Sequence, residues 1–174
     1  MPRYIAMTDD LIITATSRAD LAEIDALFAR SYPALLAGAY PPSILVTAIP
    51  LIAKANPMLV SSGTYFGVRN TNGEIVGAGG WTGRDPSAVN GTPATGHIRH
   101  VVTDHRAVRK GIGRSLMAHI LEDARAAGIM RLECLSTLMA VPFYAACGFA
   151  EVAPVTVTLR PGIEFPAVRL QREI

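Results

Sequence analysis

Residues 98–128 read IRHVVTDHRAVRKGIGRSLMAHILEDARAAG, and three patterns follow one another within them. A run rich in β-branched residues covers 98–103, a basic turn with Gly111 and Gly113 covers 109–114, and apolar residues then recur at helical spacing. Glycines let backbone N–H groups converge on a ligand, and the helix that follows adds the positive end of its dipole. The order strand, glycine turn, helix therefore predicts a cradle for an anion.

Length and composition limit the class of protein. The chain has 174 residues, half of them apolar, which is enough for a sizeable core and indicates a single domain over residues 1–174. A net charge of +2 is too balanced for a protein that binds nucleic acid through phosphate contacts alone. Because no run reaches the roughly 18 apolar residues of a membrane helix, we expect no membrane span. Cys134 and Cys147 form no metal or redox spacing, so we expect no metal site and a reducing, cytoplasmic setting.

The first half of the chain predicts a strand, helices and a hairpin. Residues 11–15 suit a strand, and Ser17 with Asp20 resembles the start of a helix. Prolines cut residues 33–62 into short pieces, for which we expect one helix near 44–54. Asn72-Gly73 predicts a hairpin between strands at 64–69 and 74–81. The polar loop 83–96 is the first candidate for contact with a variable substrate, with 31–62 as the other wall of that pocket.

The second half predicts a crossover and a closing hairpin. The apolar stripe after Gly113 should end at Gly128 as a helix cap, followed by a strand at 132–135 parallel to 98–103. A short helix at 142–146 and a hairpin of 149–159 with 163–170 complete the chain. We therefore expect an α/β fold whose mixed sheet has six or seven strands, with a central parallel pair flanked by helices. The closing strands leave open the pairing of two chains as a homodimer.

Spacing argues against two common phosphate-binding motifs for the glycine turn. A P-loop has four residues between its glycines and then Gly-Lys-Ser/Thr, which Gly111-Ile112-Gly113-Arg114 does not match. A dinucleotide fingerprint places a third glycine where Leu116 stands, although Glu133 lies where its acidic residue would. The 60 or so residues after the turn do not supply the remaining strands and helices of a doubly wound sheet. This leaves another phosphate-bearing ligand.

Two blocks resemble the signatures of the GNAT superfamily of acyl-CoA-dependent N-acetyltransferases. The first joins VVT at 101–103 to RKGIGR at 109–114, and the second is PFYAACGF at 142–149. The resemblance implies a GNAT-like fold in which Tyr144 is the general acid and the pantetheine arm of coenzyme A pairs with Val101, Val102 and Thr103. It also implies that the coenzyme A pyrophosphate binds backbone amides of Arg109, Lys110, Gly111, Ile112, Gly113 and Arg114. Two positions depart from the family: Val108 replaces Arg or Gln, and Thr137 replaces an Asn that contacts the cofactor arm.

Acyl transfer to an amine also needs a base and a donor for the oxyanion. A backbone N–H near Val101 or Val102 meets that oxyanion if the strand is bulged there. Glu133 is our first choice of base, while His97, His100 and a water chain remain alternatives. Cys134 is a poor acyl acceptor because unpaired strand cysteines are mostly small buried apolar residues, so we expect direct transfer.

The leading hypothesis is an N-acetyltransferase that moves an acetyl group from acetyl-CoA to a primary amine of a small molecule or peptide. The alternative is a non-catalytic acyl-CoA-binding sensor on the same fold, which would keep the cradle and lose the proton-transfer groups. The presence of Tyr144 favours the enzyme. Neither the acceptor nor the preferred acyl group follows from the sequence.

Overall fold

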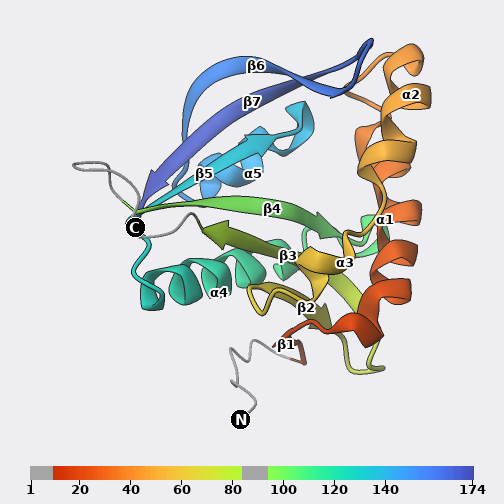
Figure 1. Cartoon of the computed structure of the whole chain (residues 1–174). Coiled ribbons are helices and arrows are strands. Elements are labelled where there is room, and N and C mark those ends of the chain that lie inside the picture. Colours follow the sequence, from red (N-terminus) through yellow and green to blue (C-terminus); the bar gives the residue numbers. More distant parts are fainter. Residues whose placement is uncertain (1–9, 84–93) are drawn as a thin grey trace.

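The computed structural model describes residues 10–83 and 94–174, and its centre is one mixed sheet (Figure 1). The strands run in the order β1-β2-β3-β4-β5-β7-β6, and only β4 and β5 are parallel. This arrangement confirms the predicted α/β fold with its central parallel pair. The strands are β1 (Ile12–Ala15), β2 (Tyr65–Arg69), β3 (Ile75–Gly83), β4 (Thr95–Thr103), β5 (Arg131–Ser136), β6 (Ala150–Arg160) and β7 (Ile163–Glu173).

Helices cover both faces of this sheet. Helix α4 (Ile112–Ala126) and α5 (Val141–Ala146) pack on one face in a core that includes Leu116 and Leu132. Helix α1 (Leu21–Leu36) and α2 (Pro42–Ile52) lie on the other side, over a second core that includes Phe28 and Phe165 (Figure 1). The remaining short helices are η1 (Arg18–Asp20), α3 (Pro57–Val60), η2 (His105–Ala107) and η3 (Leu138–Ala140).

Helix α4 forms where the apolar stripe predicts it. Its stripe residues are all buried, and Gly128 just beyond its end has a φ of +84°. A glycine adopts this left-handed conformation without the steric cost that a Cβ brings. The helix thus links β4 to β5 by the predicted crossover. The buried stripe is Leu116, Met117, Ile120, Leu121 and Ala124.

The proline-rich region is more helical than expected. Helix α1 continues through Pro33 to Leu36, and α2 begins at Pro42 rather than near Ile44. A further helix, α3, begins at Pro57. Pro42 and Pro57 occupy first-turn positions, where the missing N–H removes no intrahelical bond. The prolines thus start helices or lie inside them. The expected helix near 44–54 is present as α2, but the expectation of a single helix in this region was wrong.

The two predicted hairpins are present, as is the helix start at Ser17. Ser17 and Asp20 form a reciprocal capping box. In the first hairpin the N–H of Gly73 donates to the carbonyl of Asn70 at 2.9 Å, and Gly73 has a φ of +79°. Most of the expected substrate loop 83–96 lies outside the described residues. Within the described ranges, no helix is long and apolar enough to cross a membrane.

Candidate active site

Strands β4 and β5 separate part of the way along their length. Their parallel pairing ends at His97 opposite Glu133, after which β5 continues beside β7. On its other side β4 carries a bulge, because Ala78 pairs with Val102 whereas Gly80 pairs with Arg99. His100, inside the bulge, has a φ of +42°. A bulge leaves ladder donors unpaired, so the strand feature that an oxyanion contact near Val101 requires is present.

A cleft of about 1460 Å³ occupies the region where the strands diverge. It reaches from the start of α4 and the α5 helix, past β4 and β5, to α1 and α2 on the opposite face. Of the site residues expected from the sequence, all except Lys110 line it. Those that do are Val101, Val102, Thr103, Arg109, Gly111, Ile112, Gly113, Arg114, Glu133, Thr137 and Tyr144.

The start of α4 offers free backbone donors to this cleft. Gly111 precedes the helix with a φ of +78°, and the helical ladder begins with the N–H of Ser115 donating to its carbonyl at 3.0 Å. The N–H groups of Ile112, Gly113 and Arg114 therefore precede the first intrahelical bond. A Cβ on Gly111 would meet nothing within 4 Å, so space is open above this turn. Such a turn fits a phosphate group, and Arg114 adds positive charge beside it.

Asp104 forms ion pairs in the loop that leads into this turn. It was not among the residues singled out from the sequence. Its buried carboxylate accepts from Arg30 Nε of α1 at 3.1 Å and from Arg106 Nη2 at 2.8 Å. Hydrogen bonds from Arg106 hold the pKa of Asp104 well below its usual range. Arg106 thus forms an ion pair with Asp104 and does not line the cleft. An Asp directly after a strand is a common helix cap, a signal that could have identified it.

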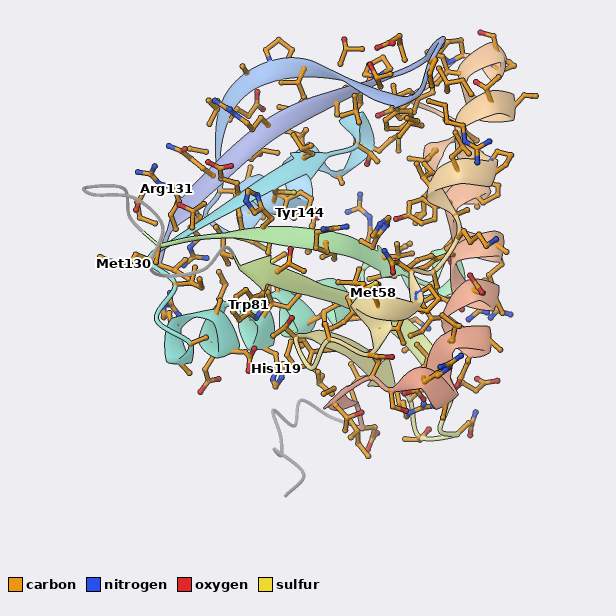
Figure 2. The ribbon with its side chains drawn as sticks, viewed as in Figure 1. Met58, Trp81, His119, Met130, Arg131 and Tyr144 are labelled. Carbon is orange, nitrogen blue, oxygen red and sulfur yellow. The ribbon has the colours of Figure 1, made fainter. Side chains whose placement is uncertain are left out.

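Tyr144 lies in the region between the diverging strands (Figure 2), with its side chain against Cys134 of β5. Burial raises the pKa of Tyr144 well above its ordinary value, and the nearby Cys134 adds to this. The phenol is therefore protonated at neutral pH and acts as a hydrogen-bond donor. Burial likewise raises the pKa of the Cys134 thiol to about 12. A thiol that stays protonated is a poor nucleophile, which agrees with the expectation against an acyl-enzyme.

The three candidate bases also line the cleft. His97 Nδ1 lies 3.8 Å from Glu133 Oε2, and both side chains are about one-third exposed. His100 sits deeper, stacked on Phe28 and with Nδ1 3.4 Å from the hydroxyl of Tyr32. Burial, and then the positive charge of Arg99, lowers the pKa of His100. Burial thus makes His100 a weaker base than an ordinary histidine, whereas the side chain of Glu133 is partly open to solvent.

Comparisons with known proteins agree with this geometry. A model of the acetyltransferase (GNAT) family matches residues 23–149. PaiA N-acetyltransferase from Thermoplasma acidophilum, solved with coenzyme A, is 14% identical with a TM-score of 0.68, over 97% of this chain and 100% of that one. Polyamine N-acetyltransferase from Drosophila melanogaster is 13% identical with a TM-score of 0.67, over 95% and 100% of the two chains.

A third similar structure is N-acetylglutamate synthase from Neisseria gonorrhoeae, solved with coenzyme A and N-acetylglutamate. It is 22% identical with a TM-score of 0.61, over 97% of this chain and 36% of that one. No curated protein sequence matches the chain. Since the family model spans well over half of the sequence, the chain belongs to the GNAT family of acetyltransferases. It is therefore an acyltransferase.

Proposed function

We propose that this chain, as a single domain, transfers an acetyl group from acetyl-CoA to a primary amine of a small molecule or peptide. The observation that carries the proposal is one continuous cleft lined by the glycine turn, the bulge of β4, Tyr144 and Glu133. A ligand bound at Gly111 through a phosphate group has a path between the diverging strands to the side of the cleft under α1 and α2, the acceptor side, where the amine would bind. Its reacting end would then lie between a hydrogen-bond donor and a carboxylate.

Three parts of the cleft suit coenzyme A. The free N–H groups at the start of α4 suit its pyrophosphate, with Arg109 and Arg114 in the lining and Lys110 next to Arg109 in the chain. The edge of β4 at Val101, Val102 and Thr103 suits a pantetheine arm, because β5 no longer pairs with it there. Thr137, just after β5, lines the opposite wall. When bound, the cosubstrate supplies the activated thioester.

In the proposed reaction the amine attacks the thioester carbon directly. The carbon–nitrogen bond forms, the carbon–sulfur bond breaks, and the proton from the amine passes to Glu133. A backbone N–H near Val101 stabilises the carbonyl oxygen as it gains negative charge. Tyr144 donates a hydrogen bond to the departing sulfur. Because its pKa is raised, we propose that Tyr144 acts chiefly through this hydrogen bond and that the thiolate gains its proton afterwards.

Glu133 is the proposed base because of its position at the last pair between β4 and β5. His97, 3.8 Å away, can pass the proton on to solvent. Burial beside Phe28 and Tyr32 lowers the pKa of His100 and disfavours its protonated form, so we do not propose it as the base. We also propose a cytoplasmic location, supported by Cys134 and Cys147, which are both free thiols.

The test is release of free thiol from acetyl-CoA across a panel of amines, with wild type compared with Tyr144→Phe. We expect turnover by wild type and a fall in kcat of about 100-fold for the variant. Coenzyme A affinity and the melting temperature should be unchanged, since Phe keeps the ring that packs against Phe149. Tight binding of coenzyme A with no turnover on any amine would instead favour the sensor.

A further inference from the structure

The acceptor side of the cleft carries charged groups from three strands on one face of the sheet. On β5, Leu132 and Cys134 point into the core under α4, so Glu133 points to the opposite face. On β7, Phe165 points into the core under α1 and α2, and alternation places Arg169 on that same face. Arg169 pairs in register with Leu135, two residues beyond Glu133.

Arg99 belongs to the same face on the other side of the opening. Tyr65, Gly80 and Arg99 are directly paired across β2, β3 and β4. Tyr65 lies in the core under α1, and cross-strand partners share a face. Arg99 and Arg169 therefore stand on this face on either side of the opening, since β4 carries one and β7, beside β5, carries the other. Both arginines line the cleft.

These two arginines differ from four others near the sheet. Arg30, Arg69, Arg106 and Arg131 each form an ion pair with a carboxylate. Neither Arg99 nor Arg169 has an ion-pair or hydrogen-bond partner among residues 10–83 and 94–174. A guanidinium group without a partner is well suited to bind a planar carboxylate through two parallel hydrogen bonds.

The cleft contains little else that is charged on this side. Glu133 is the one carboxylate among the described residues that line it. Helices α1 and α2 contribute Tyr32, Leu35, Leu36 and Ile52, and β7 contributes Phe165. An acceptor with several positive charges would face two arginines and one carboxylate, which is unfavourable. An apolar body with one anionic group is matched better.

We infer that the acceptor is a small amino acid with an apolar side chain, whose free carboxylate binds Arg99 and Arg169. This inference rests on the proposed function and specifies its substrate class. The acceptor amine lies towards Glu133, and the side chain lies against the apolar wall from α1 and α2. A peptide whose only carboxylate is at its far end fits this arrangement less well, because that carboxylate is far from the amino group.

The experiment compares acceptors that differ only in the carboxyl group: leucine, leucinamide and 3-methylbutylamine, with spermidine as a polycation. Thiol release from acetyl-CoA is measured for wild type, Arg99→Gln, Arg169→Gln and the control Arg125→Gln, whose side chain is outside the cleft. We expect leucine to have a kcat/KM at least about 10-fold above leucinamide and 3-methylbutylamine. Each cleft variant should raise KM for leucine about 10-fold and leave KM for 3-methylbutylamine unchanged.

Two results separate failure of this inference from failure of the proposed function. If wild type acetylates 3-methylbutylamine as well as leucine, or spermidine best, the carboxylate inference is overturned while the acetyltransferase stands. If no amine is acetylated, the proposed function fails, and calorimetric binding to the enzyme with coenzyme A then decides the inference. Leucine binding that Arg99→Gln weakens supports the carboxylate site, and equal binding of leucine and 3-methylbutylamine overturns it.

Discussion

Cε2 of Phe143 lies 3.0 Å from the point that a Cβ on Gly113 would occupy. The first turn of α4 therefore touches α5, and the next residue of α5 is Tyr144. The proposed phosphate-binding turn and the proposed hydrogen-bond donor are held together by this contact. The same point lies 3.4 Å from Cγ2 of Thr103 at the end of β4, so a side chain here has little room to move aside.

Gly113→Ala should displace Phe143 and, with it, Tyr144. We expect weaker binding of coenzyme A and a fall in kcat, together with a loss of stability of about 1–3 kcal/mol from overpacking. Isothermal titration with coenzyme A and urea unfolding measure the two effects. The double variant Gly113→Ala with Phe143→Leu removes the ring that causes the clash and should recover part of both. A single variant that binds and unfolds like wild type would contradict this account of the contact.

The anion-binding role of the turn can be tested separately at Gly111. Its φ of +78° suits Asn and Asp better than other side chains, and nothing lies within 4 Å of a Cβ there. Gly111→Asn and Gly111→Asp have nearly the same shape and differ in charge. We expect Gly111→Asp to bind coenzyme A about 10-fold more weakly than Gly111→Asn at low salt, with similar melting temperatures. Equal affinities would place the pyrophosphate elsewhere.

The proposed base predicts a distinct kinetic result. Glu133→Gln keeps the shape of the side chain and removes its capacity to accept a proton, so kcat/KM should fall about 100-fold with coenzyme A affinity unchanged. His97→Gln and His100→Gln are the matched comparisons. A larger loss in His100→Gln than in Glu133→Gln would assign the base to the bulge of β4.

Local patterns predicted most elements and the central parallel pair, whereas ion pairs between side chains far apart in the sequence were not predictable. The turn at 109–114 and the cap at Gly128 follow from glycines whose conformations are set within a few residues. The expected helix near 44–54 is present as α2 but begins earlier, at Pro42, and α3, which begins at Pro57, was missed. A proline that breaks a helix and one that starts it look alike in sequence. Asp104 meets Arg30 across 74 positions of the chain, a contact that only the packing of α1 on the sheet creates. The positions of Arg99 and Arg169, which have no ion-pair partner in the described part of the chain, likewise depend on the register of the strands.

The Asp104 ion pairs should stabilise the loop that leads into the proposed phosphate-binding turn. Asp104→Asn leaves Arg30 and Arg106 without their carboxylate, and we expect a loss of about 2–3 kcal/mol in the free energy of unfolding at neutral pH. Arg106→Gln should cost less than about 1 kcal/mol, because the Arg106 side chain is 67% exposed and its partner keeps Arg30. Urea unfolding of the two variants and wild type measures both differences.

The pH dependence of the stability difference between wild type and Asp104→Asn tests whether the charge of Asp104 causes it. The pKa of Asp104 is lowered in the folded protein relative to about 3.9 in the unfolded chain, so its contribution is full above the unfolded value. As the pH falls below about 4 towards the folded pKa, the unfolded chain takes up the proton first and the contribution declines. The gap between wild type and Asp104→Asn should therefore be constant from about pH 8 to 6 and narrow below about pH 4. A gap that stays constant to the lowest measurable pH would mean that the ionisation of Asp104 does not account for the difference in stability between the two proteins.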